Sequence, residues 1–185
     1  MTRVVVIDTE TTGLSPLKGG HRVVEIAAIE IIDGQITGQL FHSYVNPEGK
    51  KSSVRAQKVH QLNASFLSAQ PLFSEIAEAL LEFIHGAELS YYNLEFDQSF
   101  IQTEFDKAGF DIVFSRDYQS SCLMMDFANQ KNKGKRLSLD NACRRFGIDI
   151  SERKVHGAVV DAQLTAELYI KLHYSEEKAL TKTPQ

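Results

Sequence analysis

The first third of the chain contains apolar runs with the length and composition of β-strands. Arg3 to Asp8 (RVVVID) is a short β-branched run that indicates a fully buried strand. A second run, Val23 to Ile32, is followed by Asp33-Gly34, a strong hairpin signal, and a third strand is expected from Gln35 to Val45. The pattern therefore predicts an antiparallel meander of three strands, with an exposed polar loop after it from Pro47 to Lys58.

Farther along the chain, apolar residues recur at the three-to-four spacing of amphipathic helices. This spacing begins near Leu72 and ends at Gly86, and a strand is predicted from Ala87 to Tyr92. Further helices are predicted over four ranges: Phe96 to Ala108, Cys122 to Asn129, Leu137 to Phe146 and Ala158 to His173. Strands followed by interleaved helices indicate the α/β class, with a mixed β-sheet flanked by α-helices.

Length and composition agree with one domain. The 185 residues are 43% hydrophobic, and we assign residues 1–173 to the domain and 174–185 to a polar C-terminal tail. No apolar stretch approaches the roughly 18 residues of a membrane span, and the first 30 residues lack the pattern of a signal peptide. Cys122 and Cys143 form no CxxC pair. We therefore expect a cytoplasmic protein with reduced thiols and no membrane partner.

Two carboxylates lie at the end of the first predicted strand. Asp8 and Glu10 are two residues apart, so on an extended chain both side chains lie on the same face. Two converging anions are costly to bury unless a cation or a proton offsets their repulsion. The spacing alone leaves two interpretations equally open, a cation site or two acids that end the strand and begin a solvated loop.

Three further residues can join such a site. Asp97 lies near the start of a predicted helix, where taken alone an acid more often serves the helix dipole. Asp161 lies among apolar residues of the last helix, where a lone charge is costly. His156, five positions earlier, either reaches the same site or is an exposed loop histidine. Four carboxylates and a histidine suit hard divalent cations, and two such ions close together are the usual apparatus for hydrolysing a phosphodiester.

Three ordered segments resemble the motifs of the DnaQ-like, or DEDDh, 3′–5′ exonuclease family: VVVIDTETTGL (Val4 to Leu14), YNLEFD (Tyr92 to Asp97) and HGAVVDA (His156 to Ala162). Over about residues 3–173 the chain is similar to the proofreading ε subunits of bacterial DNA polymerase III. The resemblance implies an RNase H-like exonuclease fold. It also implies a metal-dependent enzyme that releases nucleoside 5′-monophosphates from the 3′ ends of single-stranded DNA.

The resemblance assigns a role to each matching residue. Four carboxylates would hold two Mg²⁺ or Mn²⁺ ions: Asp8, Glu10, Asp97 and Asp161. His156 would be the general base that deprotonates the attacking water. Seven residues would bind the substrate: Thr9, Thr11, Thr12, Gly13, His60, Asn93 and Phe96. The rings of His60 and Phe96 either stack on a base or simply pack in the core, and both interpretations stay open.

Three features depart from the family pattern. Tyr92 replaces the usual histidine of the second motif, and Gln61 replaces a glycine after His60. Residues 174–185 show no evident hydrophobic docking segment, whereas ε subunits continue into a polymerase-binding segment. We expect activity to survive these changes, with an altered substrate preference or rate. A DNA polymerase catalytic subunit is an expected partner if the exonuclease domain docks it through other surfaces.

The net charge of −4 conceals an uneven distribution. Between Lys131 and Lys154 there are eight basic and three acidic residues, and a second basic group lies between Lys50 and Lys58. These residues either contact phosphates or form an ordinary solvated face, and the sequence favours neither. Two other functions stay open: an exonuclease that trims RNA 3′ ends or short oligoribonucleotides, and a catalytically weak single-strand-binding or polymerase-accessory subunit.

Overall fold

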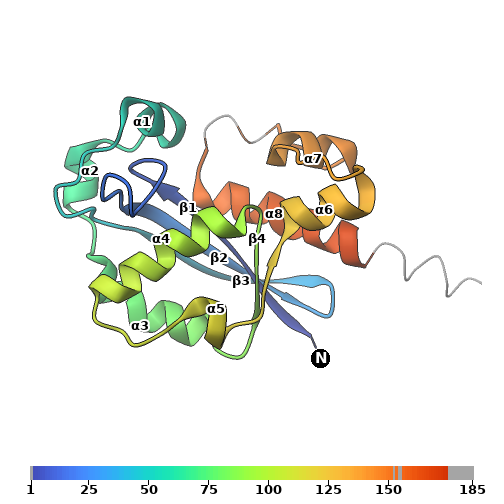
Figure 1. Cartoon of the computed structure of the whole chain (residues 1–185), viewed down its shortest axis with the longest axis horizontal. Coiled ribbons are helices and arrows are strands. Elements are labelled where there is room, and N and C mark those ends of the chain that lie inside the picture. Colours follow the sequence, from blue (N-terminus) through green and yellow to red (C-terminus); the bar gives the residue numbers. More distant parts are fainter. Residues whose placement is uncertain (1, 152, 154–155, 175–185) are drawn as a thin grey trace, which may run out of the picture.

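A computed structural model describes residues 2–151, 153 and 156–174. In this part of the chain a five-stranded mixed sheet lies between helices (Figure 1). The strand order is β3-β2-β1-β4-β5, and the bounds are β1 (Arg3–Thr11), β2 (Val23–Ile32), β3 (Gln35–Tyr44), β4 (Glu88–Tyr91) and β5 (Ser120–Cys122). The first three strands form the predicted antiparallel meander, and β4 and β5 extend the sheet in the direction parallel to β1.

Helices pack on both faces of the sheet, which confirms the predicted layering. One face is covered by α3 (Phe73–Ile84), α4 (Leu94–Lys107) and α5 (Phe114–Asp117). The other is covered by α6 (Leu123–Lys131), α7 (Leu139–Arg145) and α8 (Ala158–His173). β1 is buried from both sides: Val4 and Val6 pack toward α8, whereas Val5 and Ile7 pack toward α3 and α4.

Strand β1 extends three residues past its predicted end at Asp8. Asp8 and Glu10 therefore lie within the strand, where their partners on β2 are Ala27 and Glu25. The register shifts only between Glu10 and Thr11. The apolar pattern ends at Asp8, but pairing with β2 keeps the backbone extended. Because the two acids continue the face of Val4 and Val6, both side chains lie on the α8 side of the sheet.

The predicted loop from Pro47 to Lys58 is wrong in its second half. Helix α1 (Val54–His60) begins there, and the Ser53 hydroxyl caps it by accepting the Ala56 N–H at 3.1 Å. Helix α2 (Ala64–Ser68) follows. Within α1 only His60 is buried, so the sequence shows no apolar stripe that would reveal the helix. The very short α5 and β5 were also not expected.

The remaining helices begin and end within two residues of their predicted bounds, and α8 matches fully. Of the predicted tail, residues 175–185 lie outside the described residues. Across the part of the chain that is described, no helix is both long and apolar enough to span a membrane.

Candidate active site

The carboxyl ends of the parallel strands β1 and β4 lie side by side at one end of the sheet, and α4 and α8 begin there. A cavity of about 310 Å³ opens at this edge. It is lined by the five residues expected to be catalytic, namely Asp8, Glu10, Asp97, His156 and Asp161, and by Thr9, Tyr92, Asn93, Phe96, Leu139 and Arg153. The fold thus brings together acids that are more than 150 residues apart in the sequence.

Asp97 is held in the cavity by β1. Thr9 donates two hydrogen bonds to Asp97 Oδ1, from its backbone N–H at 3.0 Å and from its hydroxyl at 2.7 Å. Asp97 lies in the first turn of α4 and is 4% exposed. Its carboxylate is therefore fixed in the cavity by β1, in addition to lying where an acid favours the dipole of α4.

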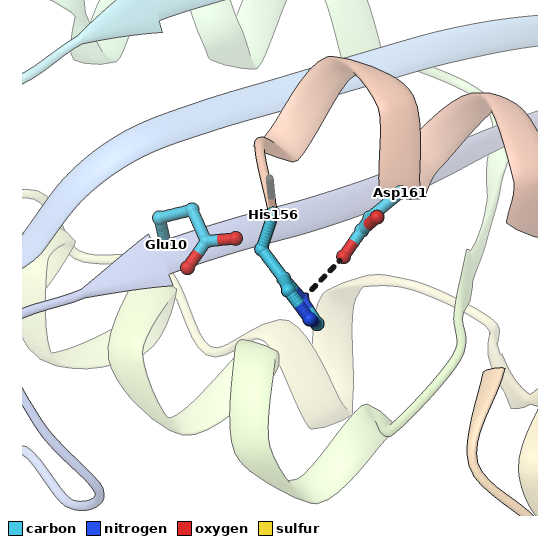
Figure 2. Close-up of side chains that lie close together, drawn as sticks. All are labelled: Glu10, His156 and Asp161. Carbon is cyan, nitrogen blue, oxygen red and sulfur yellow. Dashed lines mark ion pairs between the residues drawn. The ribbon is translucent and has the colours of Figure 1, made fainter. Parts of the chain in front are cut away.

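His156 and Asp161 reach the cavity from the start of α8. The first helical N–H, that of Ala158, donates to Glu25 Oε2 at 3.2 Å, which fixes this end of α8 to β2. Glu10, His156 and Asp161 each offer one ligand atom, and these atoms lie within 4.8 Å of one another (Figure 2). His156 Nδ1 is 3.3 Å from Asp161 Oδ2. This spacing allows the three groups to hold one cation.

Burial and mutual repulsion disfavour the charged forms of these acids. Burial raises the pKa of Asp8 well above its ordinary value, and Asp97 and Asp161 raise it further. The pKa of Glu10 rises to about 8, first through burial and then through Asp161, and burial brings the pKa of Asp97 to about 7. Asp161 is the exception: burial acts to raise its pKa, but the hydrogen bonds and the positive charge of Arg153 bring it below the ordinary value.

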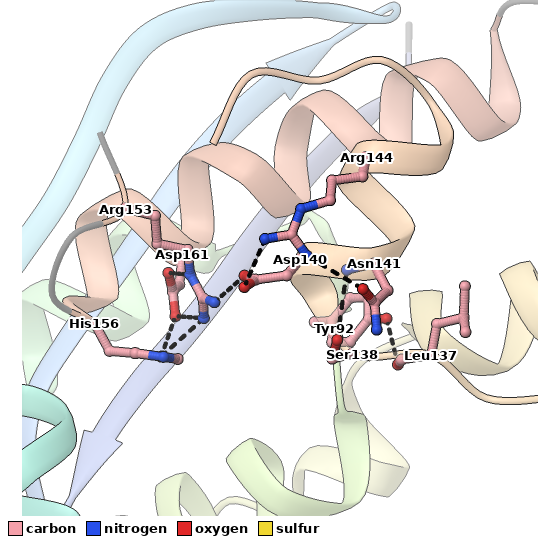
Figure 3. A network of polar contacts seen from close by, with 9 residues as sticks. All are labelled: Tyr92, Leu137, Ser138, Asp140, Asn141, Arg144, Arg153, His156 and Asp161. Carbon is pink, nitrogen blue, oxygen red and sulfur yellow. Dashed lines mark hydrogen bonds and ion pairs between the residues drawn. The ribbon is translucent and has the colours of Figure 1, made fainter. Parts of the chain in front are cut away.

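Arg153 lies inside this acidic cavity, which the sequence did not indicate. Its Nε and Nη2 each donate to one oxygen of Asp161 at 2.6 Å, and Nη2 lies 2.8 Å from His156 Nδ1 (Figure 3). Its Nη1 pairs with Asp140 of α7. The expectation that Arg153 belongs to a basic surface is therefore wrong, because a planar guanidinium fits the buried carboxylate in two-point fashion.

The rest of the predicted basic segment is divided. Lys133, Lys135 and Arg136 are exposed. Arg145 instead closes a turn by donating to Asn132 Oδ1 at 2.6 Å and to the Lys131 carbonyl at 3.0 Å. Lys154 lies outside the described residues.

A larger cleft of about 550 Å³ adjoins the acidic cavity and shares Thr9, Glu10 and Phe96 with it. Its other walls are the loop after β1 and helix α1, through Thr11, Gly13, Leu14, Ser15, Lys18, His21, Ser53, Arg55, Ala56 and Val59. Helix α1 thus supplies part of the site that the sequence did not reveal. The available signal was Ser53, a good N-cap, followed by the helix formers Arg55 to Lys58.

The predicted substrate-binding residues fall into three groups. Thr9, Thr11, Gly13 and Phe96 line the larger cleft, and Asn93 lines the acidic cavity. Thr12 is fully buried and lines neither cavity, because its hydroxyl accepts the Arg22 N–H at 3.0 Å. Gly13 is required by close packing, since a Cβ there would lie 2.3 Å from the His21 ring.

His60 also lines neither cavity. It is 4% exposed, and its Nδ1 accepts the Leu62 N–H at 2.9 Å. Its Nε2 is buried and has no hydrogen-bond partner among the described residues, and burial lowers the pKa of the ring. The next residue, Gln61, ends α1 in the left-handed conformation with φ 59°. The family's glycine at this position is therefore explained by backbone geometry.

Tyr92, the second departure from the family pattern, directly follows β4 and connects it to the segment before α7. Its hydroxyl donates to the Leu137 carbonyl at 2.7 Å, just before α7, and its side chain lines the acidic cavity (Figure 3). A histidine could not make the same reach from this position, so the substitution changes how the wall of the cavity is supported.

The donor set fits hard divalent cations. Carboxylate oxygens converge from β1, α4 and α8, burial and mutual repulsion raise the pKa values of Asp8 and Glu10, and the guanidinium of Arg153 pairs with Asp161. A mixed sheet with such a cluster at the carboxyl ends of its parallel strands is the arrangement expected of a metal-dependent nuclease.

The chain belongs to the Exonuclease (RNase_T) family, whose model matches residues 5–169, and it is a 3′–5′ exonuclease. It is 38% identical over 177 residues to the DNA polymerase III subunit epsilon of Pasteurella multocida, covering 92% of this chain and 68% of that one. It is 37% identical over 175 residues to the Escherichia coli subunit, covering 93% and 72%. The family generally depends on divalent metal ions.

Solved structures confirm the RNase H-like exonuclease fold. The nuclease domain of 3′hExo, a DEDDh family member bound to rAMP, superposes with a TM-score of 0.77 at 14% identity, covering 92% of this chain and 90% of that domain. Escherichia coli Exonuclease I in complex with a dT13 oligonucleotide gives a TM-score of 0.79 at 16% identity, covering 98% and 43%.

Proposed function

We propose that this protein removes nucleotides from the 3′ ends of single-stranded DNA, as the proofreading exonuclease of a DNA polymerase III-type replicase. The observation that carries the proposal is one cavity that holds Asp8, Glu10, Asp97, Asp161 and His156 beside a cleft large enough for a nucleotide. DNA is favoured as the substrate because the chain aligns over more than nine-tenths of its length with DNA polymerase subunits.

In this proposal the acids bind two divalent ions, Mg²⁺ or Mn²⁺. When bound, such ions activate the attacking water and neutralise the charge that develops on the scissile phosphate. Thr9 orients Asp97 through its two hydrogen bonds, and Glu25 holds the start of α8 so that Asp161 and His156 face β1. His156 accepts the proton of the attacking water at a ring nitrogen that carries a lone pair.

The larger cleft receives the terminal nucleotide. Leu14, Val59 and Phe96 present apolar surface to a base, while Thr11 and the backbone at Gly13 form the wall next to β1. The basic side chains of Lys18 and Arg55 at the same cleft offer charge to the preceding phosphates. A polymerase catalytic subunit is proposed as the partner, docked through a surface of this domain.

One experiment tests the activity. A 5′-labelled single-stranded DNA is incubated with the purified protein and Mg²⁺, and the products are separated by length. We expect stepwise shortening from the 3′ end, abolished by EDTA and by Asp8→Asn. Shortening that survives both treatments, or no shortening at all, contradicts the proposal.

A matched RNA strand tests the alternative of RNA trimming, which the rAMP-bound neighbour favours. Faster shortening of RNA than of DNA would replace DNA as the proposed substrate. Tight binding to either strand without shortening over hours would instead indicate a binding subunit.

A further inference from the structure

Arg153 has an unusual position for a cation beside a metal-binding cluster. Its side chain is 10% exposed and that of Asp161 is 7% exposed. The two groups share a two-point interaction, with both N···O distances at 2.6 Å. Both oxygens of Asp161 are therefore used by Arg153, in a cavity whose other acids have raised pKa values.

We propose that Arg153 is the built-in counter-ion of the metal-free site, which metal ions must displace before the site can act. A carboxylate that already holds a guanidinium in two-point fashion cannot also ligate a divalent ion in the same place, because the two cations repel each other and compete for the same lone pairs. Metal binding at Asp161 is thus an exchange of one cation for another. The proposal rests on the proposed function of this site.

The same contact controls His156. His156 Nδ1 lies 2.8 Å from Arg153 Nη2 and 3.3 Å from Asp161 Oδ2. Arginine has only donors, so when the shorter of the two contacts is the hydrogen bond, Nδ1 is its acceptor. The ring proton then lies on Nε2, and Nδ1 has no lone pair left for a water molecule. A neutral His156 in this arrangement cannot act as a general base. Loss of the Arg153 contact frees the lone pair on Nδ1.

The structure also provides a place for the displaced side chain. Nη1 of Arg153 pairs with Asp140 in the first turn of α7 (Figure 3), and the Asp140 side chain is 33% exposed. Arg153 can leave Asp161 and keep Asp140 as its partner. Displacement therefore does not require the guanidinium to lose all its partners.

Mn²⁺ affinity, measured by calorimetry on the whole chain, tests the exchange. Arg153→Gln removes the competing cation, so we expect Mn²⁺ to bind about 10- to 100-fold more tightly than to the parent protein, which corresponds to the loss of charge-assisted hydrogen bonds. Arg144→Gln is the matched control. It removes an equal charge from a residue that also approaches Asp140, at 3.8 Å, and whose ion pair among the described residues is with Asp140 and not with Asp161.

We expect the control to change Mn²⁺ affinity by less than about threefold, because Arg144 is exposed and its charge is screened. Equal affinities in the two variants, or weaker binding by Arg153→Gln, would overturn the proposal. Should Arg153→Gln fail to fold, Arg153→Lys takes its place. It keeps the charge but not the planar fork, and Mn²⁺ must then bind more tightly than to the parent.

The ¹⁵N resonances of His156 provide a second readout that is independent of activity. In the metal-free parent we expect Nδ1 to be an unprotonated acceptor, and in metal-free Arg153→Gln its resonance should move toward that of free imidazole. Identical Nδ1 resonances in the two proteins would contradict the role assigned to Arg153. If both readouts agree with the proposal while no strand is shortened, the exchange stands and the exonuclease function fails.

Discussion

Two buried groups of charged residues occupy different parts of this molecule and have different charge balances. In the first, Arg22 donates to both oxygens of Glu104 at 2.8 and 2.7 Å, and Glu104 also accepts the Val23 N–H at 3.0 Å. Arg22 also pairs with Glu48 near the surface. The buried carboxylate is thus fully satisfied by the chain itself, and this group joins β2 to α4.

The second group is the acidic cavity, where one buried arginine faces four carboxylates. Arg153 satisfies Asp161 with the same two-point geometry, but Asp8, Glu10 and Asp97 keep raised pKa values. The comparison distinguishes buried charges that stabilise the fold from buried charges that are available for the proposed chemistry. Where the chain supplies its own partner, a buried ion pair supports the fold, and where negative charge is left in excess, the site needs a cation from solution.

The largest effect is expected for Asp8→Asn, which removes a carboxylate from the unbalanced group. Activity should fall by several orders of magnitude, because Asp8 lies at the centre of the cluster and no other described residue can replace its oxygen ligands. Single-turnover cleavage of a labelled strand measures this loss of activity. The metal-free protein should unfold at the same or a higher temperature, since a repelled carboxylate has been removed. A large drop in thermal stability would contradict this view of the cluster.

His156→Ala should slow cleavage about 10²- to 10⁴-fold, the usual contribution of a general base. Mn²⁺ binding should persist, because the carboxylates remain. Single-turnover cleavage of the same labelled strand measures the loss of activity, and the Mn²⁺ affinity from calorimetry provides the control. Full activity in this variant would exclude His156 as the base.

In the balanced group the pattern should reverse. Glu104→Gln leaves Arg22 buried with only a partly exposed partner, so the free energy of unfolding should fall by about 3–5 kcal/mol. Cleavage per folded molecule should remain close to that of the parent. Urea denaturation measures the loss, and Asp117→Asn at the exposed Arg116 pair should show no measurable change. An inactive but stable Glu104→Gln protein would break the distinction between the two groups.

The stability of the metal-free protein should depend on pH through the acidic cavity. An acid whose pKa is raised by folding keeps its proton in the folded state at a pH where the unfolded chain has lost it, so stability falls as pH rises through the folded pKa. The unfolded chain loses these protons from about pH 4, and the folded protein loses them only near pH 8 at Glu10 and pH 7 at Asp97, so stability falls from about pH 4 to about pH 8 and levels off above that.

The part of this loss that falls between about pH 6.5 and 8 is on the order of 3 kcal/mol, measured by urea denaturation in EDTA. Mg²⁺ should flatten the slope, because bound cations keep the acids ionised at lower pH. Glu10→Gln should flatten it without metal. A metal-free protein that becomes more stable with rising pH would show that the carboxylates are already neutralised in some other way.

The smallest effect is expected at Gln61, outside both groups. Its φ of 59° lies in the left-handed region, which glycine adopts without strain. Gln61→Gly should therefore stabilise the protein by about 1 kcal/mol or less, visible as a small rise in the melting temperature. Unchanged cleavage would confirm that this departure from the family pattern concerns the end of α1.

Much of the fold could be predicted because its signals are local. The β-branched runs, Asp33-Gly34 and the helical spacing of α3 and α8 gave the sheet and its layers. Helix α1 could not be predicted in this way, because its residues contact solvent and the cleft instead of a continuous core. Its stability depends on caps and on one buried histidine.

The residues of the candidate site could also be predicted in part. Asp8, Glu10, Asp97, His156 and Asp161 could be grouped from their positions in three motifs, and the structure places them in one cavity. Arg153 could not be separated from its basic neighbours, because a charge pattern does not show which side chain turns inward. Only the fold brings it to Asp161 and Asp140.

The bond from Ala158 to Glu25 has a consequence for synthesis of the protein. It joins the last helix to the second strand, and Asp161 completes a cavity that Asp8 begins. A nascent chain on the ribosome carries its first two acids from the start, but the cavity that we propose as the cleavage site is incomplete until the residues of α8 have emerged and packed. The order of the motifs along the chain thus delays nuclease activity until synthesis of the domain is nearly finished.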